Sequence, residues 1–330
     1  MLDKVLARIK PGEKEVEEIN ELTKEIISKI KIKDAKAVLG GSGAKDTWLS
    51  GNYDVDIFVK FDYERYKNKS GELSNFLEKG LKKNFRVAKL HGSRNYFQIK
   101  KNNVTFEIVP ILDIKKAEQA KNITDVSPLH ANWVKKFKKQ DEIRLVKAFA
   151  KAQHVYGAET HIRGFSGYVL EILTIHYGSF MNLVKNAVKW KDKTVIDTEK
   201  LLKNPLKELN KSKINSPLVL VDPVDRTRNA AAVLSNEKYT EFINACENFV
   251  KRPSENFFLV KKEKIPENAV VVKLKKIKGK RDTVGGKMFS FFNKLKRQLE
   301  FCGFKILKSG FIFDENIAFW FVFKDKKLSK

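Results

Sequence analysis

The sequence predicts an α+β protein with more than one domain. Its 330 residues exceed the usual size of a single hydrophobic core, and 42% of them are hydrophobic, which is enough for packed domains. The spacing of the apolar residues also changes along the chain. It predicts strands and helices in the first part, mainly helices in the middle, and strands and a helix again at the end. We expect three domains, over residues 1–137, 138–253 and 254–330.

The first domain is expected to be built on a small mixed sheet. Apolar spacing predicts an amphipathic helix over residues 12–31, and a short strand at 37–39 then meets a glycine-rich turn at 40–43 and a short helix at 44–49. Three further β-rich runs complete the sheet, over residues 55–59, 96–99 and 104–109.

Helix signals dominate the second domain. Apolar residues recur at three- and four-residue spacing over residues 141–156, 165–190 and 236–252. The stretch LVLVDPVDRTRNAAAVLS, between the last two segments, begins as a buried strand and continues as a polar, proline-broken turn. We therefore expect a mainly α-helical central domain.

The third domain is predicted to be a small βαββ module of RRM-like order. A strand over residues 269–277 precedes a helix over 287–301, and two strands follow at 304–314 and 316–323. Alternation along the last strand puts Phe319, Phe321 and Phe323 on one face and Trp320 on the other, so core packing is the expected use of the phenylalanines.

The charge of the chain favours a polyanionic partner. Lys and Arg number 66 against 40 Asp and Glu, which gives a net charge of +26 and a pI near 9.8. Such charge is typical of proteins that bind nucleic acid, because each neutralised phosphate releases counterions. A lysine-rich solvated surface that reflects genomic composition is the alternative, and an anionic membrane is less favoured because no basic amphipathic anchor is present.

The sequence predicts a cytoplasmic protein without a membrane span. No stretch of 18 apolar residues occurs, and the N-terminus is charged from its third residue. The two cysteines, Cys246 and Cys302, lie far apart without a CxxC or Cys/His cluster. Buried, reduced thiols are expected rather than a zinc site.

Three acids and a glycine-rich turn are the candidate catalytic residues. Asp54 and Asp56 alternate on a predicted strand, so both carboxylates share a face, and Glu107 lies between apolar residues on a later strand. Carboxylates this close are tolerated when Mg²⁺ neutralises them, and two ions are expected. Gly41 and Ser42, upstream of the acids, offer backbone N–H groups and a hydroxyl to a triphosphate.

Longer motifs resemble a known family. The stretches GGSGAKDTWLSGNYDVDIFV, EIRLVKAFAKAQHVYGAE, RGFSGYVLEILTIHYGSF and VDPVDRTRNAAAVLS are similar, in order and spacing, to the archaeal-type, class I CCA-adding enzymes. These enzymes are tRNA nucleotidyltransferases of the polymerase-β-like superfamily. The resemblance covers roughly residues 1–260, and RGFSGY together with VDPVDxxRN is highly specific to that family. It implies a nucleotidyltransferase palm for the first domain.

The resemblance also implies roles for single residues. Asp54, Asp56 and Glu107 fall on the three metal-binding acids. Ser42, Lys45, Lys147, Tyr156 and His130 match groups that hold or lie near the triphosphate, and Arg228 matches the arginine that discriminates CTP from ATP. The alternative for Tyr156 is a core residue at a helix end, and the alternative for His130 is a structural loop histidine. Arg228 could instead pair with Asp222 or Asp225 to fix its own turn.

Three departures from the family pattern stand out. The third acid is normally Asp, and Glu107 is one methylene longer. The arginine after the glycine-serine turn is Lys45 here, which keeps the charge but loses the bidentate fork. The family also usually continues, past the residue that ends this chain, into a tail that grips the TΨC side of tRNA, so we expect a grip mainly on the acceptor stem.

The expected function is therefore template-independent addition of C, C and A to the 3′ end of tRNA from CTP and ATP. Two alternatives stay open: another RNA nucleotidyltransferase, of poly(A), CC-only or A-only type, and a non-catalytic RNA-binding protein with the same fold. The expected partner is tRNA, contacted at its acceptor stem and 3′ end. The sequence leaves the oligomeric state open, with a homodimer among the candidates.

Overall fold

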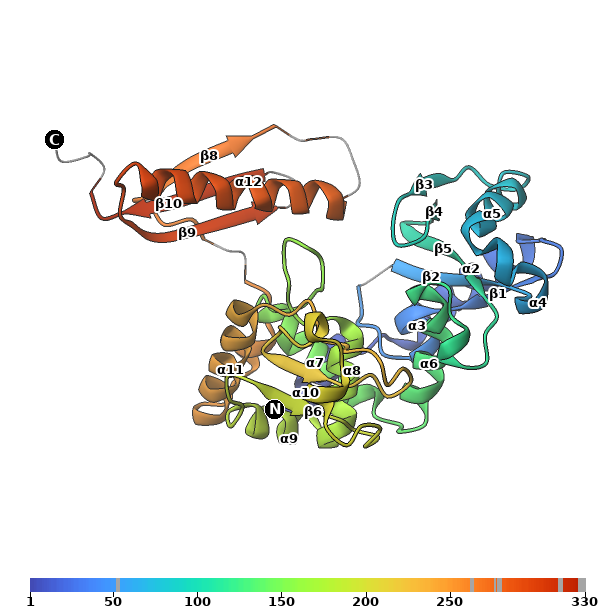
Figure 1. Ribbon diagram of the computed structural model, residues 1–330, viewed down its shortest axis with the longest axis horizontal. Coiled ribbons are helices and arrows are strands. Elements are labelled where there is room, and N and C mark those ends of the chain that lie inside the picture. The colour runs from blue at the N-terminus through green and yellow to red at the C-terminus, as the bar shows by residue number, and fades with distance from the viewer. Residues whose placement is uncertain (52–53, 262–263, 276, 278–280, 314–316, 326–330) are drawn as a thin grey trace.

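The chain folds into three parts that follow one another along the molecule (Figure 1). The structure is a computed structural model, which describes residues 1–51, 54–261, 264–275, 277, 281–313 and 317–325. In the view of Figure 1 the helical middle part lies lowest, the first sheet lies above it on one side, and the C-terminal module lies above it on the other side. The described residues include no helix long and apolar enough to cross a membrane.

The first part is a five-stranded sheet of order β1-β2-β5-β4-β3. Strands β2 and β5 run parallel, and every other pair is antiparallel. The strands are β1 (Ala35–Leu39), β2 (Asp54–Phe61), β3 (Ala88–Leu90), β4 (Tyr96–Lys101) and β5 (Val104–Leu112). Strand β3 was not predicted, because its three residues, Ala-Lys-Leu, show no apolar run.

One face of this sheet is buried by two helices. Apolar residues of α2 (Glu13–Lys29) and α5 (Leu73–Leu81) join Ile57 of β2 and Phe106 of β5 in a single buried cluster. The alternate residues of β2 and β5 therefore face the other way. This second face carries the predicted acids, and α3 (Gly41–Lys45) and α6 (Ser127–Lys135) lie near its edge (Figure 1).

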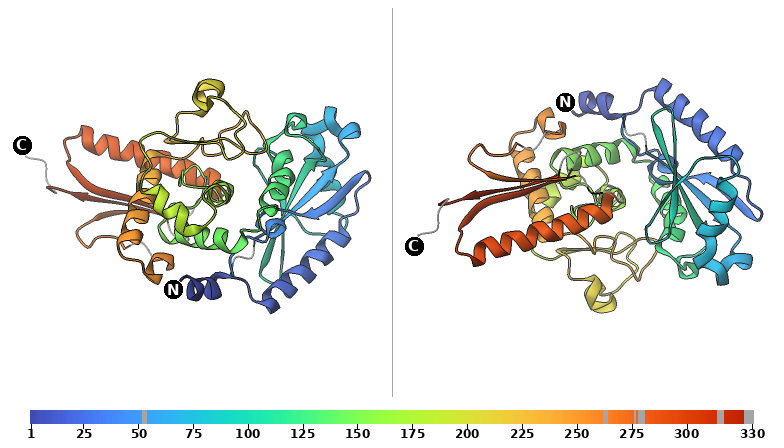
Figure 2. Two further views of the ribbon diagram at one scale, coloured as in Figure 1. Left: turned by 90° about the horizontal axis from the view of Figure 1, so that it is seen from below. Right: turned by 90° about the horizontal axis from the view of Figure 1, so that it is seen from above.

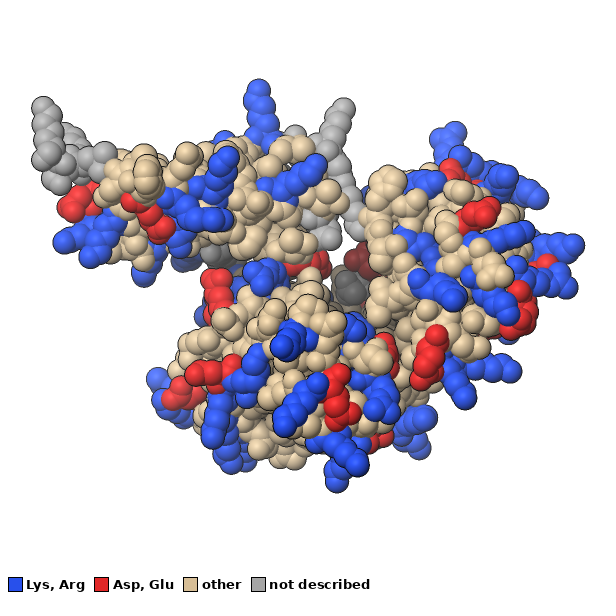
Figure 3. Space-filling model, in the orientation of Figure 1, with Lys and Arg blue, Asp and Glu red and all other residues tan. Residues whose placement is uncertain are grey.

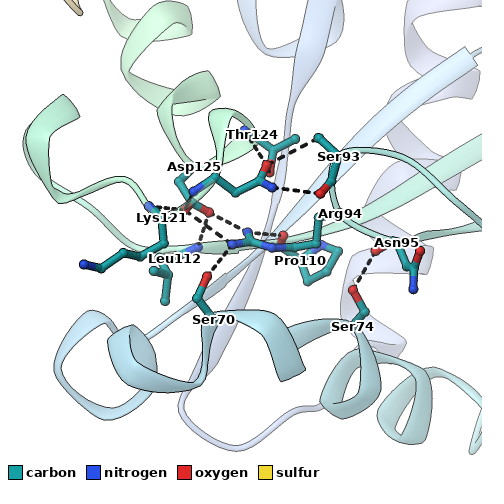
Figure 4. A network of polar contacts seen from close by, with 11 residues as sticks. Ser70, Ser74, Ser93, Arg94, Asn95, Pro110, Leu112, Lys121, Thr124 and Asp125 are labelled. Atoms are coloured by element: carbon teal, nitrogen blue, oxygen red, sulfur yellow. Dashed lines mark hydrogen bonds and ion pairs between the residues drawn. The ribbon is translucent and has the colours of Figure 1, made fainter.

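A buried ion pair ties the end of β5 to the chain that follows it (Figure 4). Arg94 Nη1 donates to Asp125 Oδ1 at 2.5 Å and to the Pro110 carbonyl at 2.9 Å, and Asp125 is fully buried. The same carboxylate accepts backbone N–H groups of Leu112 and Asn122. Because both side chains are buried and bonded to the backbone around them, we expect this pair to support the fold, and it serves below as a control.

The helical part packs around a second core. Its helices are α7 (Gln140–Ala152), α8 (Gly167–Tyr177), α9 (Phe180–Ala187), α10 (Pro205–Glu208) and α11 (Asn236–Lys251), and a two-stranded sheet pairs β6 (Thr194–Ile196) with β7 (Leu218–Leu220). The N-terminal helix α1 (Leu2–Ile9) joins the same core through Val5. Phe149 of α7 contacts the rings of Phe180, Phe242 and Phe249.

Several predicted helices have other limits in the structure: the one expected over 141–156 ends at Ala152, and the one expected over 287–301 begins at Arg281. The segment 165–190 is not one helix, because Gly178 adopts a left-handed conformation that ends α8 and Ser179 then caps α9. The short helix predicted at 44–49 lies instead at Gly41–Lys45, inside the glycine-rich turn, and Asp46 ends it in a left-handed conformation.

The C-terminal module has the predicted βαββ order. It contains β8 (Val270–Leu274), α12 (Arg281–Phe301), β9 (Ile306–Phe313) and β10 (Ile317–Phe323), with strand order β8-β10-β9. Helix α12 covers one face of this sheet (Figure 2), and Phe319 and Phe321 pack against its Phe292. The predicted strand limits at residues 314 and 316 lie outside the described residues.

The cysteine prediction is half wrong. Both thiols are free, and Cys246 is buried on α11 as expected. Cys302 is exposed, because it follows the last residue of α12 in the turn that leads to β9. Burial therefore applies only to the cysteine that lies within a helix and faces the core.

Candidate active site

The structure brings the three predicted acids together on the open face of the first sheet. In the parallel pair β2 and β5, Asp56 lies opposite Glu107 and Asp54 lies opposite Thr105. Opposite residues of a parallel pair share a face, so the three carboxylates project to the same side. Asp54 is exposed, whereas Asp56 and Glu107 are half-buried.

The glycine-rich turn lies directly against Asp56. The Gly40 N–H donates to the Asp56 carbonyl at 2.8 Å, which fixes the turn on β2. Gly41 has a φ of +52°, and a Cβ there would lie 1.7 Å from Asp56 Oδ2. Ser42 follows in α3 and, with Asp54, lines a cavity of about 550 Å³ that extends toward α2. Asp56 and Glu107 do not line that cavity, so it adjoins the acids without containing them.

The acids fit a hard divalent cation. Burial, the charge of Glu107 and the charge of Asp54 raise the pKa of Asp56 to about 6, although Lys45 opposes the shift. A cation would relieve this repulsion, and carboxylate oxygens are the ligands that Mg²⁺ prefers. Among the described residues, no group of three or more His, Cys, Asp or Glu side chains is placed to hold a metal ion by itself, and Glu107 accepts a hydrogen bond from Gln98. An ion beside these acids would therefore take part of its ligands from water or substrate oxygens.

Two predicted phosphate-binding lysines meet at one carboxylate. Lys45 Nζ lies 2.6 Å from Glu171 Oε2, and Lys147 Nζ lies 2.7 Å from Glu171 Oε1. Thr47 Oγ1 donates to Glu171 Oε1 and accepts from Lys147. Burial raises the pKa of Glu171, but the charges and hydrogen bonds of Lys147 and Lys45 outweigh it and lower the pKa to about 2. Glu171 is thus a buried anion with two cations.

Tyr156 lies beside Lys151, a residue that the sequence analysis did not select. Tyr156 is not at the end of α7 as expected, because it lies four residues beyond the helix in a bridge with Phe165. Lys151 Nζ lies 5.2 Å from the centre of its ring. Burial lowers the pKa of Lys151, and the charge of Asp54 opposes the shift. Lys151 is therefore a further cation near the acids.

His130 and Arg228 converge on a second buried acid, Asp222. Arg228 Nη1 donates to Asp222 Oδ2 at 2.6 Å, and His130 Nε2 lies 3.0 Å from the same oxygen. Tyr168 donates to Asp222 Oδ1 and stacks on His130 with 4.0 Å between the ring centres. Burial raises the pKa of Asp222, but the contacts with His130 and Arg228 lower it by more than burial raises it. The net shift of the pKa is therefore downward.

Tyr168 joins the two groups of residues. Lys45 Nζ lies 5.7 Å from the centre of the Tyr168 ring, whose other contacts are His130 and Asp222. Sequence reasoning did not select Tyr168 or Glu171. A signal for Glu171 was nonetheless present, because one acid in the apolar run YVLEILTI requires a buried partner.

Acid should weaken the fold through Glu171. Its pKa in the folded protein, about 2, lies below its ordinary value of 4.5, so the stabilisation is present above pH 4.5 and is lost as the pH falls toward 2. The shift corresponds to about 3 kcal/mol. Urea unfolding of the wild type and of Glu171→Gln should therefore show a stability gap that narrows below pH 4.5. A gap that stays constant down to pH 3 would contradict this assignment.

The fold, the acids on β2 and β5 and the glycine-rich turn beside them define a nucleotidyltransferase. A nucleotidyltransferase domain family matches residues 19–130, and a family described as the second domain of tRNA nucleotidyltransferase matches residues 141–259. The chain belongs to the CCA-adding enzyme family. It is 37% identical to the CCA-adding enzyme of Nanoarchaeum equitans, over 87% of this chain and 73% of that one. It is 33% identical to the Sulfolobus acidocaldarius enzyme, over 93% of this chain and 73% of that one.

Solved structures show the same fold at low sequence identity. A cytoplasmic RNA terminal U-transferase superposes with a TM-score of 0.58 at 13% identity, over 79% of this chain and 98% of that one. A structure of Cid1, described for its RNA terminal uridylyl transferase activity, gives 0.60 at 14% identity, over 81% and 98%. These structures confirm the expected fold class.

Proposed function

We propose that this chain adds C, C and A to the 3′ end of tRNA from CTP and ATP, with release of pyrophosphate at each step. The observation that carries the proposal is the group of three acids on β2 and β5, which lies against the Gly41 turn in a chain of the CCA-adding family. Each step forms a bond between the 3′-hydroxyl oxygen and the α-phosphorus. It breaks the bond between the α-phosphorus and the oxygen that bridges to the β-phosphate, which leaves with the pyrophosphate.

Asp54, Asp56 and Glu107 would hold the metal, for which we propose two Mg²⁺ ions. Metal ions bound there supply charge neutralisation for the attacking oxygen and the leaving pyrophosphate. The remaining residues bind and orient. Gly41 lies against Asp56, and backbone N–H groups there, together with the Ser42 hydroxyl, would suit a triphosphate.

We assign the cations beside the turn to two parts of the nucleotide, the triphosphate and the base. We assign Lys45 and Lys147, with Tyr156 and His130 nearby, to the triphosphate, because ammonium groups seek phosphate as point charges. We assign Arg228 to the base. Asp222 takes one Nη1 N–H of Arg228, and the planar guanidinium keeps further donors for the edge of CTP or ATP.

We further propose that tRNA is gripped at its acceptor stem through basic surface. Lys and Arg side chains are spread over all three parts of the molecule on the face shown in Figure 3. With a net charge of +26, most of the affinity for RNA would be electrostatic and would weaken with salt. Minihelices that contain only the acceptor and TΨC arms should therefore remain good substrates.

An extension assay tests the function directly. A tRNA that ends at the discriminator base is incubated with Mg²⁺ and with CTP alone, ATP alone, or both. We expect two additions with CTP, none with ATP alone and three with both. Additions of A without CTP would indicate a poly(A)-type or A-only enzyme, and a stop after two C with both present would indicate a CC-only enzyme. Binding of tRNA without any addition would indicate a non-catalytic protein.

A further inference from the structure

Glu171 is a fully buried acid whose partners come from two elements of the proposed nucleotide site. We propose that Glu171 is a positioning residue for nucleotide binding, which holds the Lys45 and Lys147 ammonium groups side by side so that both act on one triphosphate. The inference rests on the proposed function, because it takes those two lysines as phosphate ligands. In this role Glu171 does not contact the nucleotide itself but acts on it through Lys45 and Lys147.

The geometry gives each ammonium group its own oxygen of one carboxylate. Lys45 lies 2.6 Å from Oε2 and Lys147 lies 2.7 Å from Oε1, and the side chain of Glu171 is 0% exposed. Thr47 closes the arrangement, because its hydroxyl contacts both Lys147 and Glu171. The bonds join the chain after the glycine-rich turn to α7 and α8. Loss of the carboxylate would therefore free both lysines at once.

The charges lead to the same conclusion. Burial lowers the pKa of Lys147 to about 8 even though Glu171 opposes the shift, and the nearby charges of Lys45 and Lys151 lower it as well. Two adjacent ammonium groups without an acid between them would repel each other. Glu171 opposes the fall in the pKa of Lys147 and so helps to keep this lysine charged, in a site where a triphosphate needs positive charge.

Helix α8 extends the arrangement toward the base-reading residues. Tyr168 and Glu171 are three residues apart on α8, so their side chains are neighbours on one side of the helix. The ring of Tyr168 lies beside Lys45 and its hydroxyl binds Asp222, the partner of Arg228. The first turns of α8 thus support both the phosphate-binding lysines and Arg228.

The test compares nucleotide affinity with stability. Glu171→Gln keeps the shape but loses the charge, and Glu171→Asp keeps the charge but withdraws it by one methylene. Asp125→Asn is the matched control, because it also breaks a buried pair but at Arg94, away from the lysines. We expect the Glu171→Gln change to raise the KM for CTP about tenfold with little change in kcat, since uniform binding is lost. The control should lower the melting temperature with KM unchanged.

The outcomes separate this inference from the proposed function. A KM for CTP within about threefold of wild type in the folded Glu171 variants would overturn the positioning role. If the Glu171→Gln variant does not fold, the KM for CTP of the Glu171→Asp variant is compared with wild type by the same threefold limit. Lys45→Met tests the function itself. If that change leaves KM unaltered, or if the wild type does not extend tRNA, the proposed site fails, whatever the Glu171 variants show.

Discussion

Replacement of Asp56 by asparagine is expected to lower kcat for addition of both C and A by on the order of a thousandfold, because a metal-bound group supplies several kcal/mol of charge stabilisation. Asp56 is a neighbour of both other acids, since it lies opposite Glu107 on the adjacent strand β5 and shares β2 with Asp54. Asparagine has nearly the same shape, so the loss would be one of charge. The measurement is single-turnover extension of tRNA with each nucleotide.

Asp113→Asn is the matched control for this change. Asp113 follows β5, pairs with Lys60 at the far end of β2 and is half exposed, so its replacement removes one negative charge without touching the acids. We expect activity within about twofold of wild type and a stability change below about 1 kcal/mol. Retention of activity by Asp56→Asn at the level of this control would remove the catalytic assignment.

The acids could be predicted from sequence because they depend on local rules. Alternation along a strand places Asp54 and Asp56 on one face whatever the rest of the fold does. Their meeting with Glu107 depends on which strands pair and in which register, and no local pattern states that β5 lies parallel to β2. Only the resemblance to a family predicted that Glu107 joins the two aspartates.

The partners of the cations could not be predicted. Glu171 lies 126 residues beyond Lys45, and Asp222 lies 92 residues beyond His130. These pairs exist because the first sheet packs against the helical part, which the spacing of residues in the sequence does not record. The pairing of Arg228 with Asp222 was weighed as an alternative to base recognition. The structure shows the pairing, and because a guanidinium has five donors, the pairing and base recognition are compatible.

Gly41→Ala should reduce kcat about a hundredfold through its effect on Asp56, a loss of the size seen when one preorganised catalytic group is removed. The new Cβ would lie 1.7 Å from Asp56 Oδ2, so either the carboxylate or the turn has to move. The backbone adds strain, because a φ of +52° is unfavourable for alanine. The measurement is the rate of CTP addition at saturating nucleotide, with unfolding by urea in parallel.

Gly51→Ala separates these two causes. Gly51 also has a positive φ, of +75°, but no atom of the described residues beyond its chain neighbours lies within 4 Å of a Cβ built there. We expect this control to lose about 1 kcal/mol of stability and to keep its activity, because only the backbone is strained. If both alanine variants kept wild-type rates, the contact between Gly41 and Asp56 would not matter for catalysis. A defect confined to Gly41→Ala would show that the turn holds the central acid where the reaction needs it.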